Sequence, residues 1–175
     1  MTEPEFSRPV RLDTLGAEPR RLGIEADAAE REALAKRFAL RAIAKLEAEA
    51  ELVRNGEEVV ASGRLRAAVT QSCVASGEPV EAGIDEPFNL VFRPRSEAGR
   101  PDDEVELDAA ELDVTFYDGT SIDLGEAVAE SVALALDPYA RAPGAEQALK
   151  AAGVKSEEEA GPFGALAALR DKMKE

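Results

Sequence analysis

Hydrophobic positions recur at two different spacings in the first forty residues or so, and the change of spacing separates strands from a helix. Short apolar runs at residues 10–12 and 21–24 predict two strands joined by a turn-rich link. From Asp27 the spacing becomes helical, and Glu30 stands three residues later as a capping-box partner. The pattern therefore predicts a helix over about 27–38, with Leu34 and Phe38 on its apolar side.

Strict alternation of apolar and polar residues follows on both sides of an Asn55-Gly56 pair. This alternation predicts two long half-exposed strands, and Asn-Gly predicts a hairpin turn in which both residues accept a positive φ. A helix over 40–53 is the alternative, because alanine, leucine and glutamate favour helices. We favour the strands because the alternation continues beyond the turn. The apolar faces comprise Leu40, Ala42, Ala44, Leu46, Ala48, Ala50 and Leu52, with Ile43 on the opposite face, and then Val59, Ala61, Gly63, Leu65, Ala67 and Val69.

The second half of the chain predicts further strands and a second long helix. Residues 86–93 and 112–116 alternate again, a polar acidic loop lies between them, and Asp118-Gly119 predicts a hairpin that returns at Ile122. Asp123 and Glu126 form another capping-box pair, so a helix should start there and end at Asp137-Pro138. We expect the apolar residues of these elements to be buried: Phe88, Leu90, Phe92, Leu112, Val114, Phe116, Val128, Val132 and Leu136.

This order of elements does not alternate between strand and helix, so it predicts an α+β fold. We expect an antiparallel β-sheet or a partly closed barrel, packed by two main helices. A short helix near 145–152 and a helical tail from Pro162 should follow. The expected division is an α+β domain at residues 1–155 and, at 156–175, an acidic linker with a C-terminal apolar helix.

The net charge and its distribution along the chain disfavour some classes of binding partner. The net charge of −15 is carried almost wholly by residues 67–175, which hold 9 basic and 23 acidic residues, against 12 and 13 in residues 1–66. Nonspecific binding to DNA, bare RNA or an anionic membrane is therefore disfavoured. The N-terminal part keeps arginine clusters that suit a local phosphate contact. No secretory signal or membrane span is visible, so we expect a cytoplasmic protein.

Several catalytic chemistries are excluded or unsupported. The absence of histidine excludes sites that need a histidine ligand or base, and the single cysteine excludes an internal disulfide. Cys73 has no neighbouring lysine or arginine to activate it and is interpreted as a small half-buried thiol. The acidic stretch 102–113 lacks the ligand spacing of an EF-hand, and we expect neither a metal nor a cofactor. For a carboxylate-based site, Asp113 and Asp118 come nearest to a pair.

The C-terminal segment offers a candidate binding element. Phe163, Leu166 and Leu169 recur at intervals of three residues and give a short helix one apolar edge. This helix either docks on its own domain or inserts into a groove of a partner.

Four ordered segments of the sequence resemble the YceD family, the large ribosomal RNA subunit accumulation proteins. They are residues 64–73, 77–80, 122–139 and 161–166, and they contain the family-motif residues Cys73, Glu78, Pro79, Asp123, Leu124 and Glu126. Many family members carry a second cysteine three residues after the first, where this chain has Ser76, so a metal or redox role of such a pair has no support here. The resemblance implies a bacterial factor required for accumulation of 23S ribosomal RNA, and it carries over no catalytic residue.

We therefore expect a non-enzymatic factor in biogenesis of the large ribosomal subunit. Its acidic part would bind a basic ribosomal protein or assembly factor. Precursor RNA would be contacted weakly or indirectly, through Arg64, Arg66, Arg93 and Arg95. The alternative is a Mg²⁺-dependent hydrolase or nuclease that acts on precursor RNA through carboxylates. A third hypothesis is a regulator that acts by protein contact alone.

Overall fold

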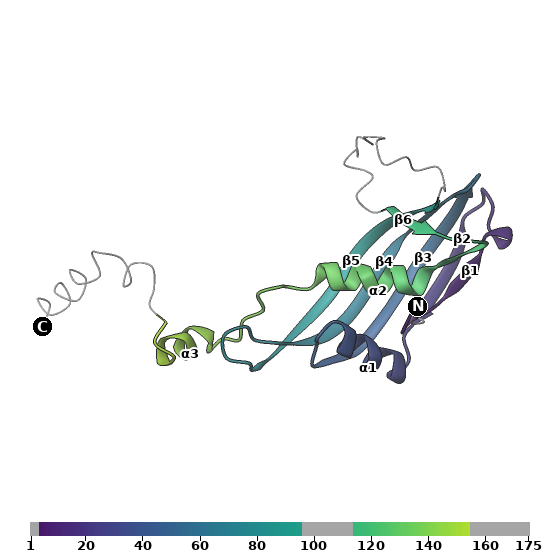
Figure 1. Ribbon diagram of the computed structural model, residues 1–175. Coiled ribbons are helices and arrows are strands. Elements are labelled where there is room, and N and C mark those ends of the chain that lie inside the picture. The colour runs from purple at the N-terminus through teal and green to yellow at the C-terminus, as the bar shows by residue number, and fades with distance from the viewer. Residues whose placement is uncertain (1–3, 96–113, 155–175) are drawn as a thin grey trace, which may run out of the picture. The chain divides into compact units, whose positions relative to one another are not determined.

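The computed structural model describes residues 4–95 and 114–154. They form two units, one made of residues 4–71, 81–95 and 114–137, the other of residues 72–80 and 138–154. The expected boundary at residue 155 coincides with the end of the described part and stays a prediction. The strands are β1 Pro9–Arg11, β2 Arg20–Glu25, β3 Ala42–Asn55, β4 Glu58–Ser72, β5 Pro79–Pro94, β6 Val114–Tyr117 and β7 Ser121–Asp123, and the helices are α1 Ala28–Arg37, α2 Leu124–Ala135 and α3 Ala145–Ala151 (Figure 1).

The predicted α+β class is confirmed. Five strands form an open, mostly antiparallel sheet in the order β2-β3-β4-β5-β6, while β1 and β7 form a separate antiparallel pair. The pair β5–β6 is parallel, which differs from the expected all-antiparallel sheet. A parallel neighbour requires a long crossover connection, and residues 95–113 supply that length.

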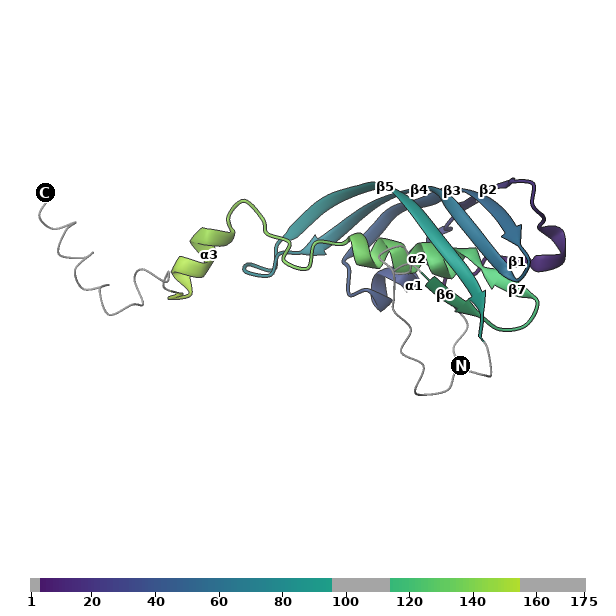
Figure 2. The same cartoon turned by 90° about the horizontal axis from the view of Figure 1, so that it is seen from above.

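Both long helices lie on the same side of the five-stranded sheet (Figure 2). The inward-facing residues of the sheet and the helices share one hydrophobic core, to which Phe6 of the N-terminal segment also contributes. The expected core residues Phe88, Leu90 and Phe92 are buried. The opposite side of β2, β3 and β4 presents charged side chains, among them Arg21 and Glu51, and the two candidate RNA-contacting residues of β4, Arg64 and Arg66, lie on this outer face.

A β-bulge shifts the predicted pattern at the start of β3. The pairing register between β3 and β4 changes between Ile43 and Lys45, so the extra residue turns the strand over. Ile43 is buried, whereas Ala42 and Ala44 are exposed, which is the reverse of the expected assignment. The predicted alternation is correct from Leu46 onward and along β4.

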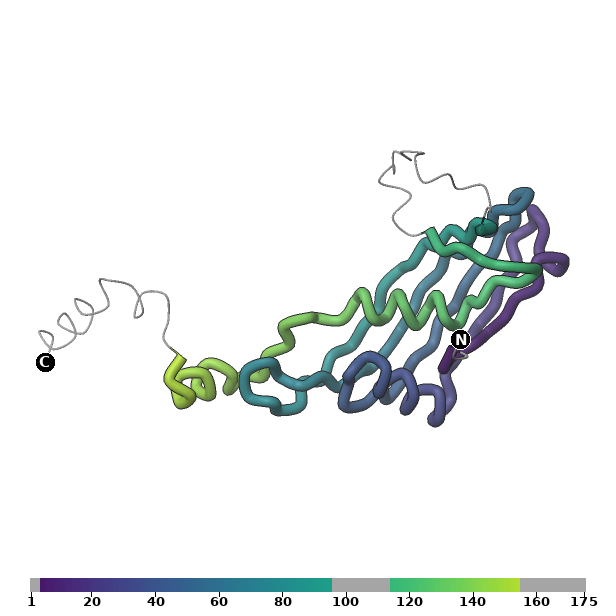
Figure 3. The backbone as a smooth tube through the Cα atoms, in the orientation of Figure 1, coloured from purple at the N-terminus to yellow at the C-terminus, as the bar shows by residue number. Residues whose placement is uncertain are grey.

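The structure differs from the sequence prediction at both predicted hairpins. The β3–β4 hairpin exists, but its loop residues are Gly56 and Glu57, and only Gly56 takes a positive φ, of 66°. Gly119 also forms a turn, with φ 82°, yet β7 pairs with β1 instead of returning along β6. Figure 3 shows the N-terminal chain running beside the segment that leads into α2. The end of β5 already pairs with β6, and β7 is held by the N-terminal strand.

The buried side of β6 is also reversed. Phe116, expected in the core, has 57% of its surface exposed, while Tyr117 is 8% exposed and donates its hydroxyl to the Glu57 carbonyl at 2.6 Å. This hydrogen bond gives the phenol a partner, so the Tyr117 ring can be buried without leaving its hydroxyl unsatisfied.

Both predicted helix starts are confirmed, with one difference. Asp27 and Glu30 form a complete capping box at α1. Asp123 accepts from the Glu126 backbone N–H at the start of α2, but the Glu126 carboxylate binds Arg37 of α1 instead of completing the box. The second unit contains the short predicted helix α3 and a small cluster of Cys73 with Ala142 and Ala145.

Candidate interaction surface

The candidate arginines of β4 lie on the outer face of the sheet, where carboxylates of neighbouring strands reach them. Arg64 Nε lies 2.5 Å from Asp85 Oδ1. Arg66 lies 3.6 Å from both Asp85 and Glu47. Arg64 lowers the pKa of Asp85, and Asp85 raises the pKa of Arg64. Both arginines therefore belong to a cross-strand ion-pair cluster.

The other two candidate arginines are also paired. Arg93 Nε contacts Glu58 Oε2 at 3.0 Å, and Arg95 Nε lies 3.6 Å from Asp118 Oδ2. A phosphate group that approached any of the four would have to compete with a carboxylate already in place. The structure brings Arg64 and Arg66 together around one carboxylate, and it gives Arg93 and Arg95 separate partners.

Cys73 and Glu78 form a tight turn in the second unit. The Cys73 N–H donates to the Glu78 carbonyl at 2.7 Å, and the Ser76 N–H lies 3.4 Å from the Cys73 sulfur. The Ser76 hydroxyl, together with backbone N–H groups including that of Ala142, lowers the pKa of Cys73 to about 6. The thiol is only 3% exposed, so the turn stabilises a thiolate while shielding it from solvent. Pro79 begins β5 directly after this turn.

Asp123 and Leu124 fix the first turn of α2 against the N-terminal segment. The Asp123 carboxylate accepts from the Ser7 hydroxyl at 2.5 Å, the Arg8 N–H at 2.8 Å and the Glu126 N–H at 3.1 Å. Leu124 is completely buried. These two family-motif residues therefore act in this fold by positioning α2.

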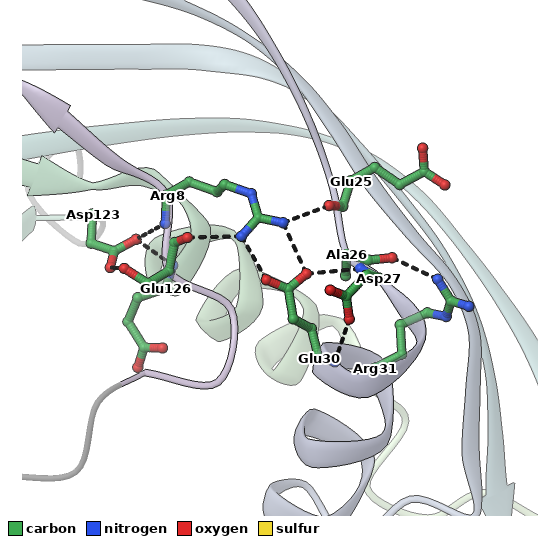
Figure 4. Close-up of polar contacts among 9 residues, drawn as sticks. Arg8, Glu25, Ala26, Asp27, Glu30, Arg31, Asp123 and Glu126 are labelled. Atoms are coloured by element: carbon green, nitrogen blue, oxygen red, sulfur yellow. Dashed lines mark hydrogen bonds and ion pairs between the residues drawn. The ribbon is translucent and has the colours of Figure 1, made fainter.

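Arg8 is the centre of a hydrogen-bond network that the sequence analysis did not single out (Figure 4). Its guanidinium binds both oxygens of Glu30, at 2.6 and 2.8 Å, and donates to the Glu25 carbonyl at 2.8 Å. Glu30 in turn accepts from the Asp27 N–H, so Arg8 ties the N-terminal segment to both β2 and α1. Arg8 lowers the pKa of Glu30. Only the capping-box pattern at Asp27 and Glu30 was visible as a sequence signal.

Glu126 joins the two helices through Arg37. Arg37 donates to both carboxylate oxygens of Glu126, at 2.9 and 2.7 Å, and to Glu5 at 3.0 Å. The three side chains are each only about a third exposed or less, so this network holds α1, α2 and the N-terminal segment together. The third family-motif residue of α2 is thus also structural.

A groove runs between the C-terminal half of α2 and β5. Two adjoining hollows of about 450 and 220 Å³ share Glu86 and Ala135, and we call their combined lining the α2–β5 groove. Leu134 stands at its rim with 85% of its surface exposed. Leu134 lies outside the apolar stripe formed by Val128 and Val132, so its exposure could have been predicted from the helical spacing, but the sequence analysis did not use this position. The lining comprises Leu65, Gln71, residues 82–90, Ser131 and residues 134–137.

Two carboxylates beside this groove have no ion-pair or hydrogen-bond partner among the described residues. They are Glu86 in the lining and Glu130, one turn before Leu134 on α2. Burial, followed by the nearby Glu126 carboxylate, raises the pKa of Glu130. α2 itself contains no lysine or arginine. The groove therefore combines the exposed side chain of Leu134 with Glu86 in its lining, and Glu130, whose pKa Arg37 lowers in turn, follows one turn away on α2.

The remaining candidates give no catalytic arrangement within the described ranges. Among residues 4–95 and 114–154, no group of three metal-ligating side chains comes together. Asp118 is 73% exposed and contacts Arg95, and Asp113 lies outside the described part. Phe163, Leu166 and Leu169 also lie outside it. No helix within the described part is long and apolar enough to cross a membrane.

Comparison with known proteins agrees with the sequence resemblance. A family model described as large ribosomal RNA subunit accumulation protein YceD matches residues 61–170. This range contains all four of the segments that carry the resemblance. No curated protein and no solved structure matches the chain.

Proposed function

The chain belongs to the YceD family of large ribosomal RNA subunit accumulation proteins, and we propose that it is a non-enzymatic, cytoplasmic factor that binds a basic protein of the precursor large subunit. The family name connects the chain with large-subunit ribosomal RNA.

The observation that carries this proposal is the α2–β5 groove. Leu134 is the most exposed large hydrophobic residue in the described part of the chain, Glu86 lines the same hollow, and Glu130 lies one turn earlier on α2. Neither carboxylate has an ion-pair or hydrogen-bond partner among the described residues. Ribosomal proteins are basic, and a cationic segment with an apolar side chain would neutralise the carboxylates and cover Leu134. Such a contact would keep the basic segment from premature association with RNA.

The ion pairs of the four candidate arginines favour a protein partner over direct RNA binding. Arg64, Arg66, Arg93 and Arg95 each face a carboxylate within the described structure. Binding of phosphate there would leave the displaced carboxylates unpaired, which offsets the gain from the new contact. We therefore propose that these four arginines contribute at most a weak, secondary RNA contact.

Site-specific photocrosslinking in bacterial cells tests the proposal. A photoreactive amino acid at position 134 should crosslink to a large-subunit protein or assembly factor, and the crosslink should weaken as salt rises in lysates. The same amino acid at Glu49, which is exposed on the outer face of the sheet, is the matched control. Changing both Glu86 and Glu130 to glutamine should reduce crosslinking from position 134.

Two results would contradict this assignment. One is equal crosslinking from positions 134 and 49, and the other is crosslinking from position 134 to RNA alone. Cleavage of precursor RNA by the purified protein with Mg²⁺ that is lost in Asp118→Asn would instead favour the nuclease hypothesis.

A further inference from the structure

The two sheets of the first unit leave a gap between β1 and β2 that neither sheet closes. Among the described strands, β1 pairs only with β7 and β2 pairs only with β3, although both strands line one hollow of about 380 Å³. We call this hollow the β1–β2 seam. One wall comes from residues 8–11 and Thr14, and the other from Arg20 and residues 22–24.

Side chains, not backbone pairs, hold the seam at its two ends. Arg8 Nη2 donates to the Glu25 carbonyl at 2.8 Å at one end (Figure 4), and Arg20 Nη1 donates to the Thr14 hydroxyl at 2.7 Å at the other. The strands are therefore kept near each other without forming a ladder. An open row of backbone groups between fixed ends is suited to an added strand.

The free edge of β2 offers both donors and acceptors. The Ala26 N–H donates to Leu46 of β3, and Ile24 pairs with Ala48 two residues earlier in β2. Backbone groups alternate in direction along an antiparallel strand, so those of Arg21 and Gly23 face away from β3, toward the seam. On the facing strand, Pro9 has no N–H to donate, so β2 is the better template.

The charge and the apolar residues of the seam lining indicate which kind of ligand it would bind. The lining lies wholly within the described residues and contains Arg8, Arg11 and Arg20 but no carboxylate. Arg8 and Arg11 have the carboxylate partners Glu30 and Asp13 outside the lining, whereas Arg20 has no carboxylate partner in the described structure. The apolar floor is formed by Val10, Leu22 and Ile24.

We propose that the β1–β2 seam binds an extended, acidic peptide segment of a partner protein, which adds as a strand to the free edge of β2. Alternate side chains of that segment would rest on the apolar floor, and a carboxylate would pair with Arg20, the lining arginine that has no carboxylate partner among the described residues. A single-stranded RNA fits less well, because the lining contains no aromatic side chain on which a base could stack. The proposal is independent of the α2–β5 groove and of its basic partner.

The test uses the full chain and a defined probe. The probe is a peptide that alternates glutamate with valine over about eight residues, long enough to cover β2 at roughly 3.3 Å per residue. A lysine–valine peptide and an oligouridylate of similar length serve as competing probes. Binding is measured by fluorescence anisotropy, and hydrogen exchange of the Arg21 and Gly23 amides is followed by NMR.

Arg20→Glu is the informative variant, and Arg21→Glu is its matched control. Arg21 is adjacent in sequence, but its side chain lies on the outer face and pairs with Glu51. We expect Arg20→Glu to weaken binding of the acidic peptide about tenfold or more, as for loss of a charge-assisted contact. Arg21→Glu should change it less than about twofold, well within a surface effect. Peptide binding should also slow exchange of the Arg21 and Gly23 amides.

Three results would overturn the proposal. They are failure of the acidic peptide to bind, equal weakening by the two variants, and tighter Arg20-dependent binding of the lysine–valine peptide or the oligouridylate. In the last case the seam would be assigned to a different class of ligand.

Discussion

Gly63, in the middle of β4, is a position where a single methyl group should destabilise the fold. A β-carbon added there would overlap the Glu49 carbonyl oxygen of β3. It would also lie 2.9 Å from Phe88 Cζ and 3.0 Å from Ala50 Cα. Gly63 is paired with Ala50 in the ladder, so relief of the overlap would require the two strands to move apart.

We expect Gly63→Ala to lower the free energy of unfolding by about 1–3 kcal/mol, the usual cost of overpacking a closely packed site. For a chain of this size, each kcal/mol corresponds to a fall in Tm of roughly 2–4 °C. Urea unfolding followed by far-UV circular dichroism measures the first quantity, and a thermal scan measures the second.

Gly23→Ala is the matched control. Gly23 also lies in a strand, but an added β-carbon would have no heavy atom within 4 Å, and its φ lies outside the left-handed region. This substitution should leave the free energy of unfolding unchanged or raise it by about 0.4–1 kcal/mol, because alanine restricts the unfolded chain.

A double variant tests the cause of the expected loss. The closest atom to the added methyl group is a backbone oxygen, so replacing the Phe88 ring with leucine should not rescue Gly63→Ala. The reasoning is refuted if Gly63→Ala and Gly23→Ala have the same stability. Recovery of stability in Gly63→Ala/Phe88→Leu would place the strain in the side chain instead of the backbone.

Two further predictions concern family-motif residues. Asp123→Ala should lower the free energy of unfolding by about 1–2 kcal/mol, because it removes the N-cap of α2 and the bonds to Ser7 and Arg8, whereas Asp118→Ala at a 73% exposed site should be nearly neutral in the same urea titration. Thiolate absorbance near 240 nm should titrate with a pKa of about 6 for Cys73, compared with an ordinary value of 9.0. Because the folded-state pKa is the lower one, the stability due to the thiolate is fully present above pH 9 and is lost as pH falls through about 6, so the wild-type free energy of unfolding should rise over this window relative to Cys73→Ser. Titration of the thiol near 9, or equal pH profiles for the two proteins, would contradict this second prediction.

Features that depend on residues close together in the chain follow from the amino-acid sequence. The capping pattern at Asp27 and Glu30 and the N-cap at Asp123 involve atoms three residues apart, so they form wherever the chain turns into a helix. The alternation along β4 likewise reflects a side-chain period of two. The ordered motifs were sufficient to identify the family.

Contacts between elements that are distant in the chain could not be predicted from these local patterns. The bulge at Ile43 reverses the buried face at the start of β3, and pairing of β7 with β1 replaces the expected second hairpin. The charge of Arg64 is balanced by Asp85 on the next strand, although the two residues are 21 positions apart in sequence. Strand pairing and ion pairing across such distances depend on register and on competition among several partners. Local pattern therefore predicts the elements, while the three-dimensional arrangement determines which carboxylates and strand edges remain free to bind a partner.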